Sequence, residues 1–305
     1  MDIKENVPLA PLTTFKIGGA AKYFVDVATE DEMREAIGWA HEKSLTFIVL
    51  AGGSNVLVPD EGYNGLVVHI VSGHFSFAHR ELDADGGCNL LSLIQAAGLK
   101  GLGGWESLAG IPGTIGGAVR GNAGAFGPEI KDFVHKVKAI NIYSGETRVF
   151  VNAECGFSYR NSFFKQNPKW LITRVFLELH KKNSSESAKL AQETIAEREK
   201  RHLQNVQAAG SFFMNPVAPQ NIIEMFETEK GVKSRESRVP AGWLIEKAGM
   251  KGAKVGDAQA SLQHPNYIVN IGKATSHDVR NLAQLIKLEV FNQFEVELKE
   301  EAVIL

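Results

Sequence analysis

The stretch GLGGWESLAGIPGTIGGAVRGNAGAFG, residues 101–127, contains ten of the 30 glycines in this chain of 305 residues. Glycine has no Cβ, so it lets backbone N–H groups approach a ligand closely and permits positive φ angles. It also costs about 0.5–1 kcal/mol per position in a regular element. The run therefore indicates a ligand-binding loop, with a cluster of surface turns as the alternative. It lacks the spacing of a P-loop, and no G-x-G-x-x-G occurs in the chain.

The amino-acid composition excludes some classes of binding partner. The chain is 44% hydrophobic and 22% charged, with a formal net charge of −2, so it lacks the basic excess of a nucleic-acid-binding protein. No run of 18 apolar residues could span a bilayer. The length predicts two or three domains with a sizeable core. We expect the partners to be small molecules.

The start of the chain and its cysteines indicate the cellular compartment of the protein and whether it binds a metal. The opening MDIKENVPLAPLTTF has neither the basic region nor the apolar region of a secretion signal. Cys88 and Cys155 are too few for a disulfide framework, so we expect both to be reduced and structural. His74, His79 and Cys88 match no common metal-site spacing. We expect a cytoplasmic protein without a metal site.

The first part of the chain predicts a β-α-β unit. Strands are expected at residues 22–27 and 46–51, with a helix between them that begins at the capping box Thr29 to Glu32. The second strand ends in Gly52, Gly53, Ser54 and Asn55, where free backbone and short polar side chains suit a diphosphate. A plain turn at the end of the strand is the alternative. A further strand at 65–71 closes the unit.

The rest of the chain predicts mixed α+β structure. After an irregular stretch around residues 83–87 come a helix at 90–97, the glycine loop, and strands at 135–143, 146–151 and 170–180. Residues 181–203 are polar and predict a solvated helix that connects domains. Beyond them we expect a helix at 220–230, a strand at 267–270, a helix that begins at the cap Thr275, and a terminal strand at 295–305.

Two stretches contain residues that could do chemistry. In SYRNS, residues 158–162, Arg160 next to Tyr159 could hold a carboxylate through charge-assisted hydrogen bonds, although a surface arginine would look the same. In GSFFMNP, residues 210–216, Ser211 has no neighbouring His or Asp and lies in no G-x-S-x-G elbow. If Ser211 is catalytic it should move a proton, and a structural turn is the alternative. Glu301, in ELKEEAVIL, is by itself one acid among several.

Several short sequence motifs resemble those of one family. LAGIPGTIGGAV and NAGAFG, together with TTFKIGG and AGGSNVL, are similar to the flavin-binding loops of the UDP-N-acetylenolpyruvoylglucosamine reductase (MurB) family, which lies in the vanillyl-alcohol-oxidase-like flavoprotein superfamily. GSFFMNP, PAGWLIE, Lys251-Gly252 and Leu262-Gln263-His264 resemble its third domain. The matches run from Thr13 to Glu301 in the family's order. The chain resembles the shorter type, which lacks a tyrosine-bearing insertion.

The resemblance implies roles for individual residues. The catalytic residues would be Arg160, the proton donor Ser211, and Glu301. Those implied to bind substrate are Tyr159, Asn215, Lys251 and His264. The implied FAD-binding residues are Gly52, Gly53, Ser54, Asn55, Val56, Leu57, Gly110, Ile111, Pro112, Gly113, Thr114, Gly116, Gly117 and Gly121.

The chain departs from the family pattern at three positions. Met214 stands where a lysine is usual, so the charge that this lysine would supply is missing or comes from elsewhere. Near the C-terminus the family pattern is close to L-E-P-E-V-R; here Glu300 replaces its proline and Val303 its arginine. The spacing of Leu298, Val303 and Leu305 after Phe294 favours Glu301 over Glu300 as the match to the catalytic glutamate.

The resemblance also implies the fold and the reaction. We expect an α+β protein with FAD-binding subdomains at 1–71, joined by the strand 301–305, and at 72–203, and with a substrate-binding domain at 204–300. Non-covalent FAD and NADPH would reduce UDP-N-acetylenolpyruvoylglucosamine to UDP-N-acetylmuramate for peptidoglycan synthesis, with Arg160, Ser211 and Glu301 together beside the flavin. The alternatives are an alcohol oxidase of the same superfamily and a non-catalytic nucleotide-binding module.

Overall fold

A computed structural model describes residues 1–200 and 206–305. By their internal contacts these residues form two compact units. Unit 1 comprises Met1–Val7, Ala21–Gly53 and Asn64–Lys200, and unit 2 comprises Pro8–Ala20, Ser54–Tyr63 and the described residues 206–305. The expected domain boundary at residues 203 and 204 lies outside the described residues. The expected functional domains stay a prediction.

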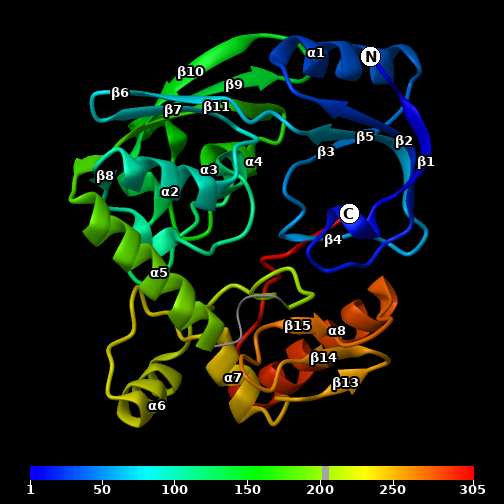
Figure 1. Cartoon of the computed structure of the whole chain (residues 1–305). Helices are drawn as coiled ribbons and strands as arrows, with labels where there is room; N and C mark the ends of the chain where they lie inside the picture. Colours follow the sequence, from blue (N-terminus) through cyan, green and yellow to red (C-terminus); the bar gives the residue numbers. More distant parts are fainter. Residues whose placement is uncertain (201–205) are drawn as a thin grey trace. The chain divides into compact units, whose positions relative to one another are not determined.

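The first sheet of unit 1 confirms the predicted β-α-β unit. Its strand order is β1 (Lys4–Pro8), β2 (Ala20–Val27), β5 (Tyr63–Ile70), β3 (Phe47–Leu50), and β3 runs parallel to β5. Helix α1 (Glu30–Glu42) begins at the predicted capping box, in which Thr29 accepts from Glu32 N–H and the Glu32 carboxylate accepts from Thr29 N–H. Its buried apolar residues, Met33, Ala36, Ile37 and Ala40, cover one face of this sheet (Figure 1).

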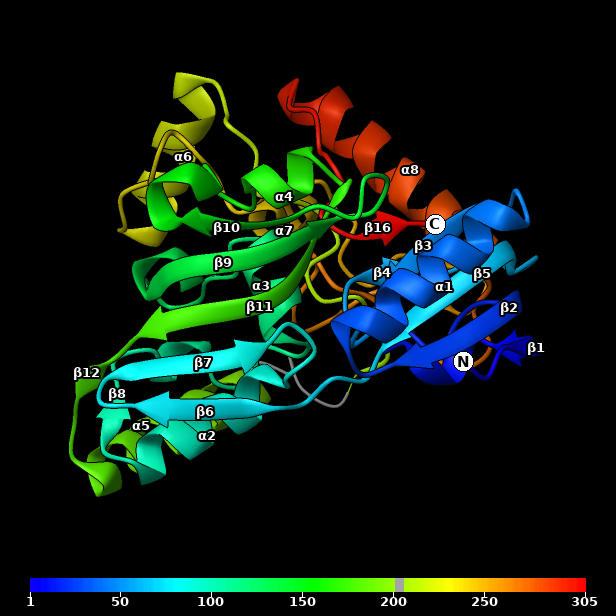
Figure 2. The ribbon, with the colours of Figure 1, turned by 90° about the horizontal axis from the view of Figure 1, so that it is seen from above.

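The second sheet of unit 1 has five strands side by side (Figure 2). Their order is β10 (Thr147–Val151), β9 (Val134–Asn141), β11 (Trp170–Glu178), β7 (Glu81–Asp85), β6 (Phe75–Ala78), with antiparallel neighbours throughout. The strands β9, β10 and β11 were predicted. The expectation of irregular structure around 83–87 is wrong in part, because β7 reaches Asp85. The charged residues of ELDAD disfavour a strand prediction, but Leu82 and Ala84 alternate with them and are fully buried.

Helices and short strands complete unit 1. They are α2 (Leu90–Leu99), α3 (Ile115–Arg120), α4 (Phe163–Gln166), α5 (Ser184–Lys200) and the pair β8 (Leu102–Gly103) and β12 (His180–Lys181). Short 3-10 turns lie at Glu106–Leu108, Ile130–Asp132 and Asn152–Cys155. The cysteines Cys88 and Cys155 are free and buried. Burial raises the pKa of Cys88 to about 11 and that of Cys155 to about 12, so both thiols stay protonated at neutral pH.

Helix α5 corrects one expectation. A helix was predicted at 181–203, but as a solvated connector, whereas Ser187, Ala191 and Arg198 are buried. The Ser187 hydroxyl donates to the buried Glu106 carboxylate (2.6 Å), and Arg198 Nε donates to the Gly110 carbonyl (3.0 Å). One face of α5 is therefore buried against polar groups. A search for apolar positions in the sequence would not reveal it. Residues 201–203 of the expected helix lie outside the described part of the chain.

Unit 2 packs helices on a small sheet. Its elements are β4 (Val56–Leu57), α6 (Gln220–Lys230), α7 (Ala241–Lys247), β13 (Lys254–Val255), β14 (Ala258–Ala260), β15 (Ile268–Asn270), α8 (Ser276–Phe294), β16 (Val303–Ile304) and a 3-10 turn at Ala10–Leu12. Helix α8 begins at the predicted capping box of Thr275 and Asp278 and runs along the β13–β14–β15 sheet (Figure 1). Its residues Val279, Leu282, Ile286 and Val290 are fully buried in the core of this unit.

The end of the chain is less regular than expected. In place of a strand over 295–305, only Val303–Ile304 is a strand, and it pairs in parallel with Val56–Leu57. Glu295 ends α8 in a left-handed conformation (φ 54°). The prediction failed because Val303 and Ile304 pair with a two-residue strand early in the chain, whose length limits the ladder. Both units mix helices with sheets, so the predicted α+β class is confirmed.

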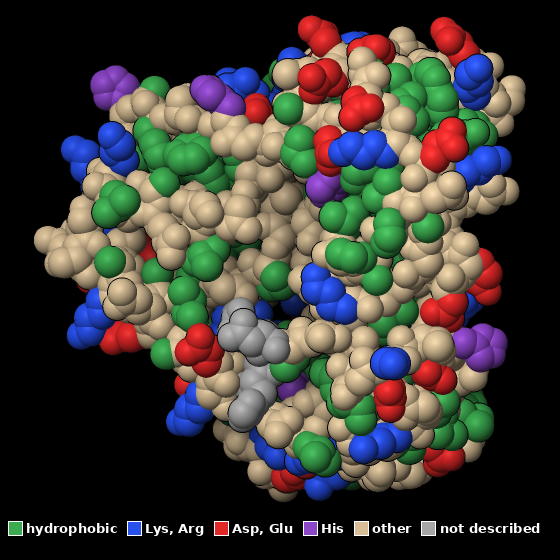
Figure 3. Space-filling view, turned by 45° about the vertical axis from the view of Figure 1, so that its right-hand side comes forward, with side chains coloured by type: hydrophobic (Ala, Val, Ile, Leu, Met, Phe, Trp, Pro, Cys, Tyr) green, Lys and Arg blue, Asp and Glu red, His purple; other side chains and the backbone are tan. Residues whose placement is uncertain are grey.

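The surface carries charges of both signs. On the face drawn in Figure 3, Lys and Arg side chains are interspersed with Asp and Glu side chains. Among the described residues, no helix combines the length and apolar character that crossing a bilayer requires.

Candidate active site

The predicted glycine loop is built around the start of α3. Thr114 caps this helix by accepting a hydrogen bond from Gly117 N–H (3.3 Å). Before the cap, Gly110 and Gly113 have φ angles of 80° and 116°, which side chains with a Cβ rarely adopt. The loop conformation therefore depends on glycine at these two positions.

The two predicted flavin loops touch within unit 1. A Cβ on Gly52 would lie 2.9 Å from the Gly113 Cα atom, so the backbones meet where neither carries a side chain. Gly116 N–H donates to the Gly86 carbonyl (2.9 Å), and a Cβ on Gly116 would lie 2.8 Å from that oxygen. Packing inside the protein thus explains Gly52, Gly113 and Gly116.

Packing does not explain Gly117. This residue is exposed within α3, and a Cβ there would make only an ordinary 3.5 Å contact with Thr114 Oγ1. Alanine would be favoured at such a helical position by about 1 kcal/mol. Without a side chain at Gly117, a flat ligand such as a flavin can approach the backbone of α3 closely. The residues present therefore fit a bound FAD.

Tyr159 and Arg160 form the tip of a tight turn in unit 1. Ser158 and Asn161 exchange two backbone hydrogen bonds (3.1 and 3.0 Å) across the turn, and Arg160 has a φ of 52°. A positive φ is uncommon for a non-glycine residue and suggests a local constraint. The Lys165 ammonium donates to the Arg160 carbonyl (2.9 Å), and the Arg160 guanidinium donates to the Gly124 carbonyl (3.4 Å).

Two fully buried polar residues connect this turn to the glycine loop. Asn122 donates through Nδ2 to the Ser158 carbonyl (3.0 Å), and the Ser162 hydroxyl donates to the Arg120 carbonyl (2.7 Å). Sequence reasoning did not single out either residue, although both lie within the quoted words. Their signal would have been a short polar side chain inside a motif that already contained a candidate residue or the glycine loop. Arg160 is thus fixed relative to the predicted flavin loop.

Ser211 and Glu301 are brought together in unit 2. Ser211 precedes Phe212 and Phe213, whose side chains are buried, and is itself partly exposed. Glu301 N–H donates to the Phe212 carbonyl (2.8 Å), and Met214 N–H donates to the Lys299 carbonyl (2.9 Å). The GSFFMNP stretch therefore lies alongside the C-terminal stretch. Glu301 is opposite Phe212, the residue after Ser211.

Asn55 fixes Glu301 from its other side. Its Nδ2 donates to the Glu301 carbonyl (3.1 Å), and its own carbonyl accepts from Val303 N–H (3.0 Å). The neighbouring Glu300 is engaged elsewhere, because its carboxylate pairs with Lys287 Nζ at 2.9 Å. This pairing gives the departure at Glu300 a structural role.

The four predicted substrate-binding residues have different surroundings. Asn215 Oδ1 accepts from Ala241 N–H (3.0 Å) at the start of α7. His264 packs edge-on against Tyr267 with ring centroids 4.9 Å apart. Lys251 Nζ pairs with Glu246 (2.7 Å) and stays 39% exposed. The Tyr159 ring lies 5.4 Å from the Arg160 guanidinium carbon in unit 1.

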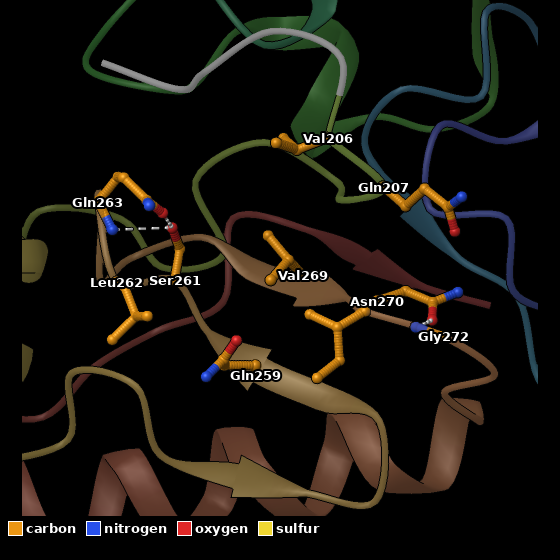
Figure 4. A pocket seen from close by; sticks show the side chains of 10 residues that line it. Val206, Gln207, Gln259, Ser261, Leu262, Gln263, Val269, Asn270 and Gly272 are labelled. Atoms are coloured by element: carbon orange, nitrogen blue, oxygen red, sulfur yellow. Dashed lines mark hydrogen bonds between the residues drawn. The ribbon is translucent and has the colours of Figure 1, made fainter. Parts of the chain in front are cut away.

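A pocket of about 490 Å³ lies in unit 2 (Figure 4). Its walls come from β14, β15, the turn between them and residues 206–207, and five of its lining residues are amides or serine: Gln207, Gln259, Ser261, Gln263 and Asn270. Ser261 Oγ accepts from the N–H groups of Gln263 and His264 (3.2 Å each). Ser261 thus both lines the pocket and holds the turn that contains His264.

The structure therefore groups the predicted site residues into two sets. Gly52, Gly53, the glycine loop, Tyr159 and Arg160 belong to unit 1, and Ser54 to Leu57, Ser211, Asn215, Lys251, His264 and Glu301 belong to unit 2. The expectation that Arg160 meets Ser211 and Glu301 stays a prediction. The structure adds Asn122 and Ser162 to the residues that shape the candidate site.

Comparison with known families gives two matches. Residues 21–150 match a family model described as an FAD binding domain. Residues 201–305 match the C-terminal domain of UDP-N-acetylenolpyruvoylglucosamine reductase.

Comparison with individual proteins extends the similarity over the whole chain. The UDP-N-acetylenolpyruvoylglucosamine reductase of Carboxydothermus hydrogenoformans is 36% identical over 99% of this chain and 94% of its own length. That of Solibacter usitatus is 33% identical, with 98% and 95% covered. Among solved structures, that of the Thermus caldophilus enzyme (MurB) is similar with a TM-score of 0.77, at 32% identity and 99% coverage of both chains.

Proposed function

Because this chain belongs to the UDP-N-acetylenolpyruvoylglucosamine reductase family, we propose that Arg160, Ser211 and Glu301 carry out its reaction. The enzyme reduces UDP-N-acetylenolpyruvoylglucosamine to UDP-N-acetylmuramate in peptidoglycan precursor synthesis. FAD, when bound, supplies the hydride chemistry, with NADPH as the hydride donor. The protein's own residues bind the reactants, orient them and move the proton.

The glycine-rich backbone is proposed to hold FAD. Gly52 and Gly53, with Ser54 and Asn55, suit the diphosphate, and the loop from Gly110 to Gly117, with Gly121, suits the flat ring. The exposed, unobstructed backbone at Gly117 supports this assignment. Ile111, Pro112, Val56 and Leu57 are proposed as further contacts on the strength of the family match.

Arg160 is proposed to stabilise charge. Adding hydride to the β-carbon of the enolpyruvyl group places negative charge on the α-carbon and its carboxylate. A guanidinium that is fixed before the reaction can stabilise that charge without reorganising. The turn around Ser158 and Asn161 and the hydrogen bond to Gly124 support such a fixed position. Tyr159 is proposed to bind substrate beside it.

Ser211 is proposed to donate the proton that completes the reaction. The Ser211 O–H bond breaks as a C–H bond forms at the α-carbon, and the alkoxide left behind recovers its proton from water after the product has left. A serine is a weak acid, so this step requires a strongly basic carbanion and a dry site. The hydrogen bond from Glu301 N–H to the Phe212 carbonyl supports this proposal, because Phe212 directly follows Ser211 in the chain.

Glu301 is proposed to polarise the surroundings of the substrate carboxylate. Asn55 and Phe212 hold its backbone from both sides, so the side chain leaves a defined point of the chain. Asn215, Lys251 and His264 are proposed to bind the sugar nucleotide. Lys251 would then exchange its ion pair with Glu246 for one with the ligand. We place the reaction in the cytoplasm.

The visible spectrum of the purified protein tests the proposed function. We expect a yellow protein whose flavin absorbance bleaches when NADPH is added without oxygen and returns when UDP-N-acetylenolpyruvoylglucosamine follows. A colourless protein, or flavin that NADPH never bleaches, would instead support a non-catalytic nucleotide-binding module. Turnover of an alcohol with oxygen and without pyridine nucleotide would support an alcohol oxidase.

A further inference from the structure

Asn266 makes three hydrogen bonds to the stretch that carries Ser211. Its backbone carbonyl accepts from Phe212 N–H (2.7 Å), its Oδ1 accepts from Phe213 N–H (3.0 Å), and its Nδ2 donates to the Phe213 carbonyl (2.9 Å). The residue is only 2% exposed. Its side-chain amide therefore pairs with both polar groups of one backbone residue, as a neighbouring strand would.

This pairing matters because the other side of Ser211 is not constrained in the same way. Gly210 precedes it with a φ of 75°, and a Cβ there would meet no atom within 4 Å. Glycine gives the backbone wide conformational freedom. The direction of the Ser211 side chain is therefore determined mainly from its C-terminal side, where Asn266 binds Phe212 and Phe213.

The same stretch lies between Asn266 and the C-terminal stretch. The Phe212 N–H points to Asn266, whereas the Phe212 carbonyl accepts from Glu301 N–H (2.8 Å). Asn266 also packs near the start of α7, since a Cβ on Gly242 would lie 3.6 Å from the Asn266 Cβ atom. One buried asparagine thus connects the turn that presents His264 with the segments that carry Ser211 and Glu301.

We infer that Asn266 is a positioning residue for proton transfer by Ser211. This inference rests on the proposed role of Ser211. A proton donor must lie within hydrogen-bonding reach of the atom that it protonates. A misplacement of about 1 Å can slow a reaction about 100-fold. Losing the Asn266 side chain should therefore slow the protonation step and leave hydride uptake from NADPH unchanged.

The test measures the two half-reactions separately by stopped-flow absorbance on flavin-loaded protein. In Asn266→Ala, reoxidation of the reduced enzyme by substrate should slow about 10- to 100-fold, while reduction by NADPH stays within about twofold of wild type. The solvent deuterium isotope effect on reoxidation should rise. Adding Asn266→Ala to Ser211→Ala should slow reoxidation no further, because Asn266 acts only through Ser211.

Asn152 provides a control outside the candidate site. It is partly buried, and its side chain also binds backbone groups: Nδ2 donates to the Lys131 and Val134 carbonyls (2.8 and 2.7 Å). Asn152→Ala should destabilise the fold without separating the half-reactions. If Asn152→Ala slows reoxidation selectively, or Asn266→Ala slows both half-reactions equally, the inference is wrong.

A second variant covers the case in which Asn266→Ala does not fold. Asn266→Asp keeps the acceptor for Phe213 N–H but loses the donor to the Phe213 carbonyl, so reoxidation should slow at least threefold, and an unchanged rate contradicts the inference. Ser211→Ala distinguishes a failure of the proposed role of Ser211 from a failure of the inference about Asn266. If Ser211→Ala slows both half-reactions equally, the proposed role of Ser211 fails; if it is selective and Asn266→Ala is not, only the inference fails.

Discussion

The side chain of Asn55 donates a hydrogen bond to the backbone carbonyl of Glu301 at 3.1 Å. These residues lie 246 positions apart in the sequence. Asn55 follows the strand-end glycines that we assign to FAD, and Glu301 is a proposed catalytic residue. The contact therefore connects the proposed cofactor loop with the proposed catalytic glutamate inside unit 2.

A double-mutant cycle tests whether Asn55 acts through Glu301. A typical hydrogen bond contributes about 0.5–1.5 kcal/mol, so Asn55→Ala should slow reoxidation by substrate about two- to tenfold in flavin-saturated enzyme. In a Glu301→Ala background the same change should have less than a twofold effect, because the backbone contact remains but the carboxylate that it positions is gone. Equal slowing in both backgrounds would show that Asn55 acts independently of Glu301.

Gly117→Ala should have opposite effects on stability and on FAD binding. The free energy of unfolding of the flavin-free protein should rise by about 0.5–1 kcal/mol, because alanine is favoured over glycine in a helix and the added Cβ makes only an ordinary contact. FAD affinity should fall, since the methyl group covers the backbone that we assign to the ligand. Urea unfolding and fluorescence titration with FAD measure the two quantities.

Gly38→Ala is the control for that experiment. Gly38 lies in α1, and a Cβ there would meet nothing within 4 Å. It should give the same gain in stability with unchanged FAD affinity. Unchanged FAD affinity in Gly117→Ala as well would remove Gly117 from the proposed cofactor site.

Glu30 should make the stability of unit 1 depend on acid pH. Burial raises its pKa, but hydrogen bonds from Lys138, Arg34 and Thr147 outweigh burial and lower the pKa to about 2. A carboxyl whose pKa is lower in the folded state contributes stability above its unfolded pKa, near 4.5, and loses it as the pH falls toward 2. Glu30→Gln should therefore cost about 1–3 kcal/mol at pH 7 and progressively less below pH 4.5.

Urea unfolding of both proteins between pH 7 and pH 3 measures this difference. Glu42→Gln, on the exposed end of the same helix, should follow the wild-type pH profile. A stability difference between wild type and Glu30→Gln that stays constant across this range would mean that ionisation of Glu30 does not stabilise the fold.

Local sequence signals predicted much of the fold correctly. The capping boxes at Thr29 and Thr275 locate two helix starts because both partners lie within three residues of each other. The glycines of residues 101–127 mark the loop around α3, because positive φ angles and close backbone contacts need that residue type. Such features depend on neighbouring residues, so one sequence reveals them.

Features that depend on distant partners were not predictable in the same way. The strand at Val303–Ile304 is short because its partner is the two-residue strand at Val56. The buried face of α5 depends on Glu106 and Gly110. Asn266 could not be distinguished from a surface turn residue, because its role depends on the backbone groups of Phe212 and Phe213, more than 50 residues away.

The two half-reactions of Ser211→Ala show whether Ser211 donates the proton. Reduction of the bound flavin by NADPH should stay close to the wild-type rate, because it involves no proton from Ser211. Reoxidation by UDP-N-acetylenolpyruvoylglucosamine should slow about 10²- to 10⁴-fold, the usual effect of losing a general acid. An equal loss in both half-reactions, or reoxidation at the wild-type rate, would contradict the role of Ser211 as the proton donor.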